Sequence, residues 1–423
     1  MLLVAWDDTD SPAGGCTTAL AAPMLARFSQ LAPDGAPRLV RLNPNIPWKT
    51  RGNAAVALRF RGDMDPHLAL REARALVDEA AQRHEGTDPG VVVAQEPLPP
   101  WLYDAAVSRV VEREEVIPLL EKTGARYHGG RGIIGAAAAL AWPAQRATWE
   151  RIAYRTPARM GTQRAVDDAW VREVEWQYAT TFDSYDLVNG EVVCVPSGPD
   201  PVLWGIRGED PDELERASAV LGPERPARET LFLTNQGTDD HLRERRASEC
   251  RDMESVRVRA RIAGAPLDRN GTVLFEIADG TGALRCAAYP PTRAFRQKAR
   301  ALDAGDDVTV CGGLHLGPDG RLTLGLEKMQ VHATAPRRAG APTCPTCGRS
   351  MKSAGKDAGY RCRECHTRAS EARFAEASVR LGWHEVPASA RRHLSEPLRV
   401  AIARGYALSR IEARPVEDGL NPL

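Results

Sequence analysis

The first 125 residues alternate short apolar runs with longer amphipathic stretches. Apolar runs typical of buried strands occur at residues 2–6, 38–42, 54–60 and 91–94. Apolar residues at helical spacing predict helices over residues 19–28, 66–82, 103–112 and 115–122. Strands that alternate with helices indicate an α/β domain over residues 1–125.

The pattern then becomes mixed, and we expect an α+β domain over residues 126–247. Strands are predicted at residues 133–142 and 231–234 and a helix at residues 211–221, while residues 167–174 look helical or mixed. Residues 148–154 look helical or mixed, and Asn189-Gly190 is a good hairpin turn. A glycine-rich joint at residues 127–135 either lines a site between two domains or is a plain hinge.

Residues 253–335 change to alternating apolar and polar positions. Five predicted strands with a helix at residues 295–302, between the third and the fourth, follow the order of an OB-fold β-barrel. Such a barrel binds single-stranded nucleic acid, or it mediates protein contacts. The last part, residues 370–423, predicts a basic tail of two or three short helices, with apolar spacing from Phe374 to Trp383 and again at Leu398 and Ile402.

An acidic cluster directly follows the first predicted strand. Asp7, Asp8 and Asp10 precede a glycine loop, and Thr17 and Thr18 then open a helix-like run. Carboxylates are the oxygen ligands that suit Mg²⁺ bridged to nucleotide phosphates, and free N–H groups at a helix start bind anions. A polar loop with a helix cap is the alternative, but three acids followed by GGCTT favour a metal–phosphate site.

A second polar loop, residues 43–53, lies between two predicted strands. Lys49, Thr50, Arg51 and Asn53 supply hydrogen-bond donors within five residues, so the loop is either a phosphate cradle or an exposed basic loop. The acidic cluster, which would complement it, favours the cradle.

Two CxxC units, fourteen residues apart, predict a zinc ribbon at residues 340–369. Cys344, Cys347, Cys362 and Cys365 would close a tetrahedral site, which makes the zinc structural. Lys+Arg equals Asp+Glu at 56 each, but the charge is uneven, since residues 337–423 carry 16 basic against 9 acidic residues. A basic C-terminal part can contact nucleic acid.

Neither a membrane span nor a signal peptide is expected. No stretch has 18 uncharged apolar residues, and the N-terminus has acids instead of a basic region. Paired cysteines in CxxC units are typical of metal binding inside the cell, so we expect a cytoplasmic protein.

Several motifs together resemble the archaeal tRNA-isoleucine 2-agmatinylcytidine synthetase family (TiaS). They are DDTDSPAGGCTT, RLNPNIPWKTRGN, TFDSYD, PSGPDPVLWGIRG and TNQGTDDHL, followed by the predicted OB-fold and four-cysteine ribbon. The resemblance keeps the motif order over nearly the whole chain. It implies a multidomain α+β protein with a kinase-like domain, a ferredoxin-like domain, an OB-fold and a zinc ribbon.

The resemblance also implies an activity. Members of the family are ligases that use ATP and agmatine to replace the C2 oxygen of the wobble cytidine, position 34, in an isoleucine tRNA with a CAU anticodon. The modified base then pairs with A. We therefore expect ATP, Mg²⁺ and structural Zn²⁺ as cofactors, tRNA-Ile and agmatine as partners, and no obligate protein partner.

Roles for individual residues follow from that resemblance. Thr17 looks like a threonine that becomes phosphorylated in the family, Asp7, Asp8 and Asp10 would hold Mg²⁺, and Lys49 and Arg51 would neutralise phosphate. The expected ATP site comprises Asp7, Asp8, Thr9, Asp10, Gly15, Thr17, Thr18, Lys49, Thr50, Arg51, Gly52 and Asn53. Agmatine is a dication, so an acidic pocket between the first two domains is expected, with Asp183, Asp186, His128 and Arg131 as candidates.

Two other hypotheses belong to different classes. The first is a non-catalytic single-strand-binding protein, because an OB-fold followed by a four-cysteine ribbon also occurs in such proteins. It leaves three carboxylates beside a KTRGN loop unexplained, and it predicts no magnesium-dependent ATP binding. The second is a small-molecule kinase with an appended RNA-binding half, which would consume ATP without changing the mass of RNA.

Overall fold

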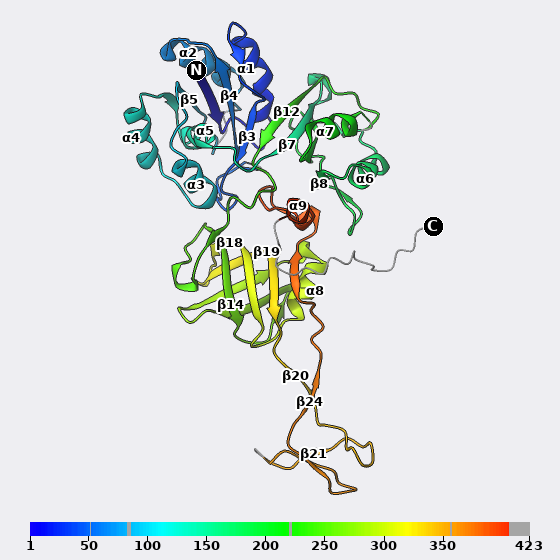
Figure 1. Cartoon of the computed structure of the whole chain (residues 1–423). Coiled ribbons are helices and arrows are strands. Elements are labelled where there is room, and N and C mark those ends of the chain that lie inside the picture. Colours follow the sequence, from blue (N-terminus) through cyan, green and yellow to red (C-terminus); the bar gives the residue numbers. More distant parts are fainter. Residues whose placement is uncertain (51, 83–85, 220–221, 356–357, 406–423) are drawn as a thin grey trace.

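The computed structural model describes residues 1–50, 52–82, 86–219, 222–355 and 358–405. Figure 1 shows two units of helices and strands side by side at one end, a barrel next to them and a small ribbon at the far end. The chain is thus a mixed α/β multidomain protein, as the hydrophobic pattern predicts.

One ten-stranded sheet runs through both α/β units, in the order β6-β5-β1-β4-β3-β12-β7-β11-β8, with β2 beside β4. A short parallel pairing, Leu233 with Arg38 and Thr234 with Leu39, joins the two halves. The first half contains β1 (Leu2–Asp7), β2 (Ala32–Pro33), β3 (Arg38–Arg41), β4 (Ala54–Arg61), β5 (Gly90–Ala94) and β6 (Arg126–Gly129). The second half contains β7 (Thr148–Tyr154), β8 (Thr181–Phe182), β11 (Val202–Gly208) and β12 (Arg228–Thr234).

Helices cover both faces of the first half. Side chains alternate along β1, so Leu2, Val4 and Trp6 pack toward α1 and α2, while Leu3 and Ala5 pack toward α3 and α5. Burial on both faces explains the continuous apolar run that predicts this strand. The helices are α1 (Ala21–Arg27), preceded by a 3₁₀ turn at Thr17–Leu20, and α2 (Pro66–Ala80), α3 (Trp101–Ser108), α4 (Arg113–Thr123) and α5 (Gly132–Ala141).

Two predictions of element type are wrong. Residues 133–142, predicted as a strand, form α5, and residues 148–154, predicted as helical or mixed, form β7. The sequence GIIGAAAALA is buried all round, and such a run cannot be assigned by periodicity. Alanine is the best helix former, which favours α5. β6 belongs to the first half of the sheet, and α5 packs on it. The domain limits at residues 125 and 126 stay a prediction.

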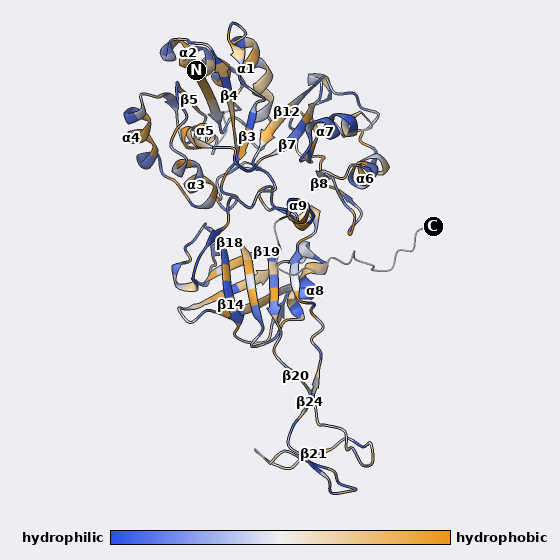
Figure 2. Cartoon of the chain, viewed as in Figure 1, coloured by the Kyte–Doolittle hydropathy of each residue, from blue (hydrophilic) through white to orange (hydrophobic). Residues whose placement is uncertain are grey.

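The second half of the sheet carries α6 (Asp168–Gln177), in a region predicted as helical or mixed, and α7 (Pro211–Ser218), as predicted. A small two-stranded hairpin, β9 (Tyr185–Asp186) with β10 (Glu191–Val192), lies beside α6. Figure 2 shows hydrophobic residues along β12 and hydrophilic residues on α7, so the buried side of this unit is its sheet.

The third part is a closed five-stranded barrel. β14 (Ser255–Ile262) pairs with both β16 (Thr272–Ala278) and β18 (Asp307–Leu316), and β17 (Ala283–Ala288) closes the ring by pairing in parallel with β19 (Leu322–Ala333). The helix α8 (Ala294–Arg300) lies between the third and fourth barrel strands, which confirms the predicted order. Short strands β13 (Arg243–Glu244) and β15 (Leu267–Arg269) extend its edges.

The ribbon projects from the barrel on a two-stranded stalk, β20 (Arg337–Gly340) with β24 (Arg373–Ala375). Its own sheet consists of β21 (Lys352–Ser353), β22 (Tyr360–Arg361) and β23 (Arg368–Ala369). After the stalk the chain adds β25 (Gly382–Glu385) to β19 and ends its described part with α9 (Leu398–Ala403).

The tail differs in part from its prediction. Residues 374–383, expected to be helical, lie mostly in β24, β25 and the link between them, whereas α9 and a 3₁₀ turn at Ala388–Ala390 are short helices as expected. Residues 406–423 of the predicted basic tail lie outside the described residues. Within the described part, none of the helices has the length and apolar character needed to cross a membrane.

Candidate active site

Carboxylates gather where β1 ends. Asp7 is the last residue of β1 and is buried, and Asp8 has a left-handed backbone, with φ of 58°. The Asp8 N–H donates to Asp7 Oδ1 at 2.7 Å, and Arg131 Nη2 lies 3.3 Å from Asp8 Oδ2. Burial, followed by the Asp8 carboxylate, raises the pKa of Asp7 well above its usual range. Burial also raises the pKa of Asp8.

Helix α5 approaches this cluster closely because it begins with glycines. A methyl carbon on Gly135 would lie 2.8 Å from Asp7 Cγ, and one on Gly132 would lie 2.7 Å from the Asp7 carbonyl oxygen. A side chain at Gly135 would displace the Asp7 carboxylate, and one at Gly132 would displace the backbone of Asp7 and Gly90. The N-terminus of α5 thus lies in contact with the acidic cluster. The helix dipole gives this N-terminus a partial positive charge, which faces the carboxylates.

Two threonines follow the glycine loop with well-defined partners. Thr9 Oγ1 donates to Thr17 Oγ1 at 3.0 Å, and Trp6 Nε1 donates to the Thr17 carbonyl at 2.9 Å. Tyr154 of β7 donates to Thr18 Oγ1 at 2.9 Å. The second α/β unit, which contains the second half of the sheet and hence β7, therefore contacts the loop after β1 directly.

The loop of residues 43–53 lies beside the acids. Thr50 Oγ1 donates to the Asp10 carbonyl at 3.2 Å, which ties the two loops together. Lys49 Nζ donates to the Ile46 carbonyl at 3.1 Å and to the Pro44 carbonyl, so its ammonium group is hydrogen-bonded to the backbone of its own loop. Burial lowers the pKa of Lys49. Arg51 lies outside the described residues.

These loops line one cavity of about 540 Å³. Most of the predicted residues lie on its wall, namely Asp7, Asp8, Asp10, Thr17, Thr18, Lys49, Thr50, Gly52, Asn53 and Arg131. Thr9 and Gly15 are not on the wall, although Thr9 supports Thr17 from behind. The structure therefore brings the acidic cluster and the second loop together.

The acids predicted for agmatine lie elsewhere. Asp183 is ion-paired with Arg391, and Asp186 accepts hydrogen bonds from Ser389 and Asn189, so both hold the C-terminal segment or a turn. Neither lines the cavity, and His128 lines a separate, smaller cavity beside Asp88. Of the four candidates only Arg131 faces the acidic cluster. Their assignment to agmatine stays a prediction.

Other polar side chains that the sequence analysis did not single out line the same cavity. Glu150 of β7 lies 3.5 Å from Arg41 Nη2 and accepts from Gln236 at 2.5 Å. Asp200 and Arg207 come from the second unit and are buried. A charged residue inside an otherwise apolar strand, as in TWERIAY and VLWGIRG, is the signal that could have identified Glu150 and Arg207.

His393 enters the cavity from the far end of the chain. The Arg41 guanidinium, together with burial and Arg207, holds the pKa of His393 well below its ordinary value of 6.5. The imidazole is therefore neutral at physiological pH. No sequence motif surrounds it that would have predicted a place in this site.

The four ribbon cysteines form a second, separate site. Their sulfurs lie within 4.8 Å of one another, with 3.5 Å between Cys347 and Cys362 and 3.8 Å from Cys365 to both Cys344 and Cys362. A zinc ion with Zn–S bonds of about 2.3 Å separates tetrahedral sulfurs by about 3.8 Å. The donor set therefore fits zinc, as the CxxC spacing predicts.

Comparisons with known proteins agree along the chain. Family models described as the TiaS TCKD domain, the TiaS FLD domain and the TiaS C-terminal zinc ribbon domain match residues 3–130, 130–241 and 341–378. The isoleucine-tRNA 2-agmatinylcytidine synthetase TiaS of Methanocorpusculum labreanum is 39% identical over 406 residues, which cover 94% of this chain and 96% of that protein.

Solved structures resemble the whole chain as well. A complex of TiaS with its isoleucine tRNA and ATP matches with a TM-score of 0.84 and 39% identity. A complex of TiaS with its isoleucine tRNA, AMPCPP and agmatine matches with a TM-score of 0.82 and 36% identity. Each match covers 94% of this chain and 96% of the solved one.

Proposed function

Since the chain belongs to the TiaS family, we propose that it joins agmatine to C2 of the wobble cytidine in an isoleucine tRNA with a CAU anticodon, using ATP. A relative solved with its isoleucine tRNA, an ATP analogue and agmatine supports each substrate. In this assignment the first unit is kinase-like, the second is ferredoxin-like and the barrel is an OB-fold. An enzyme with this tRNA substrate is expected in the cytoplasm.

The observation that carries the proposal is the single cavity shared by the acidic cluster, Thr17 and the loop of residues 43–53. Phosphoryl transfer needs positioned groups and neutralised charge more than covalent chemistry from the protein. Asp7, Asp8 and Asp10 have the carboxylates that Mg²⁺ prefers. Burial, followed by the Asp8 carboxylate, raises the pKa of Asp7, and a bound cation would favour its charged form. Bound Mg²⁺ would neutralise the phosphates of ATP.

The reaction needs an activated C2 oxygen, because a carbonyl oxygen is a poor leaving group. Transfer of the γ-phosphoryl group of ATP to that oxygen releases ADP. The primary amine of agmatine then bonds to C2 and loses a proton, while the C2–O bond breaks and phosphate leaves. Thr17 lines the cavity with its hydroxyl beside Thr9, and its phosphorylation would be a separate transfer from a second ATP, which also releases ADP. Arg131, beside Asp8, would hold phosphate oxygens.

Glu150 and Asp200 are the acids that we assign to agmatine. Both are buried, both line the cavity, and apolar side chains such as Val193 and Val202 lie on the same wall. A pair of carboxylates beside apolar surface suits a dication with a tetramethylene chain. Glu150→Gln and Asp200→Asn should each raise the KM for agmatine by about tenfold. This is the change expected when one charge-assisted hydrogen bond to the substrate is lost.

A comparison with Asp183 separates this assignment from the sequence-based one. Asp183→Asn should lower the free energy of unfolding, because it removes one of the two carboxylates paired with the buried Arg391 and leaves only Glu385, while the KM for agmatine stays unchanged. If Asp183→Asn raised that KM and Glu150→Gln did not, Asp183 would be the agmatine ligand.

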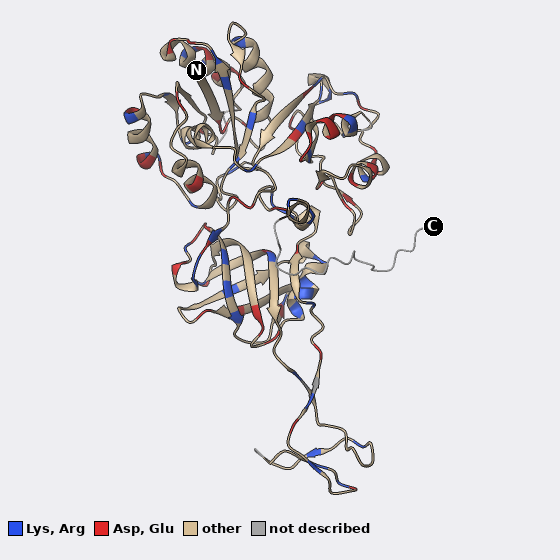
Figure 3. Cartoon of the chain, in the orientation of Figure 1, with Lys and Arg blue, Asp and Glu red and all other residues tan. Residues whose placement is uncertain are grey.

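The ribbon offers an RNA-binding surface. Lys352, Arg361 and Arg368 are exposed and lie directly opposite one another on three neighbouring strands, so they form one stripe. Figure 3 shows basic residues on the ribbon strands. Like charges in opposite positions destabilise a sheet, which suggests that the stripe serves a polyanion. The target base would leave its anticodon loop and enter the cavity.

Mass spectrometry of the tRNA tests the proposal. Unmodified isoleucine tRNA with a CAU anticodon, incubated with the protein, ATP, Mg²⁺ and agmatine, should gain the mass of agmatine less one water at the wobble cytidine. Asp8→Ala should bind the tRNA but produce no gain. Asp104→Ala, an exposed acid outside the cavity lining, is the matched control and should react normally. Binding without any mass gain by the wild type would instead favour a binding-only protein.

A further inference from the structure

The chain returns from the ribbon to the catalytic half. After β25, residues 386–404, here called the returning segment, pass between the barrel and the two α/β units and end in α9. Figure 1 shows α9 beneath the two units, next to the top of β19. The last described part of the chain therefore lies against the first half of the protein.

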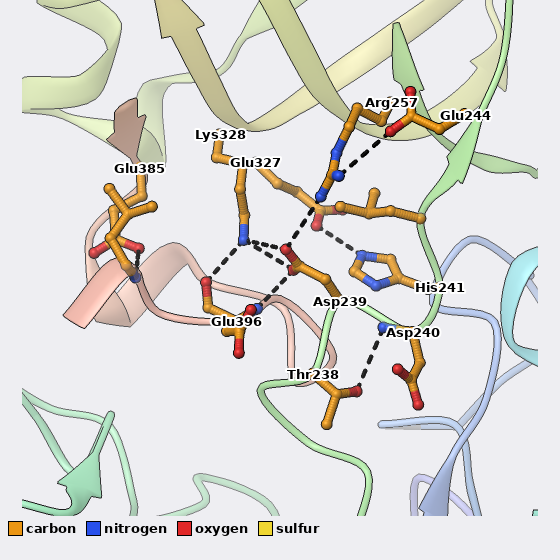
Figure 4. Close-up of polar contacts among 12 residues, drawn as sticks. Thr238, Asp239, Asp240, His241, Glu244, Arg257, Glu327, Lys328, Glu385 and Glu396 are labelled. Atoms are coloured by element: carbon orange, nitrogen blue, oxygen red, sulfur yellow. Dashed lines mark hydrogen bonds and ion pairs between the residues drawn. The ribbon is translucent and has the colours of Figure 1, made fainter. Parts of the chain in front are cut away.

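A buried polar network fixes this segment. Lys328 Nζ of β19 donates to Asp239 and to the Glu396 carbonyl, each at 2.8 Å, and the Glu396 N–H donates to Asp239 Oδ1 at 2.7 Å (Figure 4). Backbone bonds from Gly237 to the His393 carbonyl and from Asp239 to the Leu394 carbonyl add to it. The ion pair between Lys328 and Asp239 thus joins the barrel to the second unit, and backbone hydrogen bonds of Glu396 attach the returning segment to both.

Two consecutive residues of this segment contact the loop of residues 43–53. Arg392 donates to the side-chain oxygen of Asn45, and Asn45 in turn donates to Ser255 Oγ at 2.8 Å where the barrel begins. The ring of His393 and the guanidinium of Arg41 both lie against Gly52, because a methyl carbon placed there would be 3.0 Å from His393 Nε2 and 2.5 Å from Arg41 Nη1. The contact is close enough that Gly52 admits no side chain without movement of the ring.

His393 is more than a space-filling residue. Its Nδ1 is buried and has no hydrogen-bond partner among the described residues, which is costly for a group that serves packing alone. The charges of Arg41 and Arg207 act on it, and both residues line the same cavity as His393. A residue with an apolar ring would fill the same space without that cost.

We propose that His393 is a positioning residue for ATP, which acts by holding Gly52 and hence the loop of residues 43–53 in the conformation that receives phosphate. Arg392 supports the same loop through Asn45. This inference rests on the proposed function, in which that loop binds ATP. It means that the segment behind the ribbon, which belongs to the RNA-binding half, completes the ATP site.

Direct binding of a non-hydrolysable ATP analogue, measured by calorimetry, tests the inference. His393→Ala should weaken this binding by about tenfold, a change of about 1.4 kcal/mol, while the affinity for tRNA and the KM for agmatine stay within about twofold of wild type. His393→Gln, which keeps a polar side chain of similar reach, should recover most of the affinity. Arg399→Gln, which breaks another contact of the same segment, with Glu175, is the matched control and should leave ATP binding unchanged.

A double-mutant cycle adds a readout that a purely structural role would not change. Gly52→Ala and His393→Ala should be non-additive in ATP affinity, because both alter the contact between Gly52 and His393, whereas the displacement of Arg41 by Gly52→Ala occurs in both backgrounds and cancels in the cycle. Additive effects would overturn the inference, as would equal losses of ATP, agmatine and tRNA binding in His393→Ala and Arg399→Gln. A wild type that binds ATP but attaches no agmatine would refute the proposed function, while ATP affinity would still decide the role of His393.

Discussion

Gly135 gives the sharpest test of the acidic cluster, because α5 can approach Asp7 only where it has no side chain. In Gly135→Ala the new methyl carbon would lie 2.8 Å from Asp7 Cγ and 2.8 Å from Leu42 Cδ1. Carbon atoms in contact are about 3.5–4.0 Å apart, so the Asp7 carboxylate would have to move by about 1 Å. Displacement of a positioned group by about 1 Å can cost about 100-fold in rate.

The effect on stability should be much smaller. Overpacking costs about 1–3 kcal/mol, and replacement of glycine by alanine within a helix returns about 1 kcal/mol. We therefore expect a folded variant whose free energy of unfolding falls by at most about 2 kcal/mol but whose kcat falls by about 100-fold.

Two measurements separate these effects, namely urea unfolding and the rate of ATP-dependent agmatine incorporation into tRNA. Gly264→Ala, where a methyl carbon would meet nothing within 4 Å, controls for the substitution itself and should leave both unchanged. A Gly135→Ala enzyme with kcat within about threefold of wild type would refute the reasoning that Asp7 must keep this position.

Three further predictions concern the ribbon and His393. Replacement of Lys352, Arg361 and Arg368 by Gln should weaken tRNA binding at low salt and reduce its salt dependence by up to about 3 released counterions, while ATP binding stays unchanged; an unaltered salt slope would exclude the stripe from the interface. Chelation of zinc should abolish tRNA binding by the ribbon but leave ATP and agmatine binding in place, as titrations with each ligand would show. Because nearby guanidinium groups and burial depress the pKa of His393, the unfolded chain takes up a proton below pH 6.5 that the folded chain refuses, so stability should fall as pH falls through 6.5; His393→Gln should flatten this part of the melting-temperature profile, and a profile as steep as that of wild type would contradict it.

Much of the fold could be predicted from the sequence because the local patterns were unambiguous. Strand β1 is buried on both faces and appears as a continuous apolar run, and the barrel strands alternate as half-buried strands do. The prediction of a strand for α5 is wrong because a sequence that is apolar on all sides shows neither the helical nor the strand periodicity. Its alanine content favours a helix, and its burial on all sides follows from its place on the sheet.

The candidate site could be predicted only where it is local in sequence. The acidic cluster and the loop of residues 43–53 each lie within about ten residues, and the structure brings both to one cavity. Glu150, Arg207 and His393 come from three distant segments, and nothing within a few residues of any of them indicates a shared cavity. Their meeting depends on the pairing of the two half-sheets and on the path of the returning segment.

The TNQGTDDHL motif shows why a motif can identify a family without revealing what its residues do. The acids in such a loop could have been ligands, but the structure gives them other partners. The side chain of Asn235 bonds to both backbone groups of Arg41: its Oδ1 accepts from the Arg41 N–H at 2.7 Å, and its Nδ2 donates to the Arg41 carbonyl at 2.9 Å. Asp239 holds Lys328 of the barrel, and Asp240 accepts from Tyr103 at 2.6 Å.

The hydrogen bonds between Asn235 and Arg41 lie where β3 meets β12 and the two halves of the sheet join. Arg41, at the end of β3, reaches Glu150 across that junction and contacts Gly52 on the other side. A change in how the half-sheets join would therefore shift the acids assigned to agmatine relative to the loop assigned to ATP. In the proposed function the motif would fix that distance, since the contacts of Asn235 and Asp239 are with the protein itself.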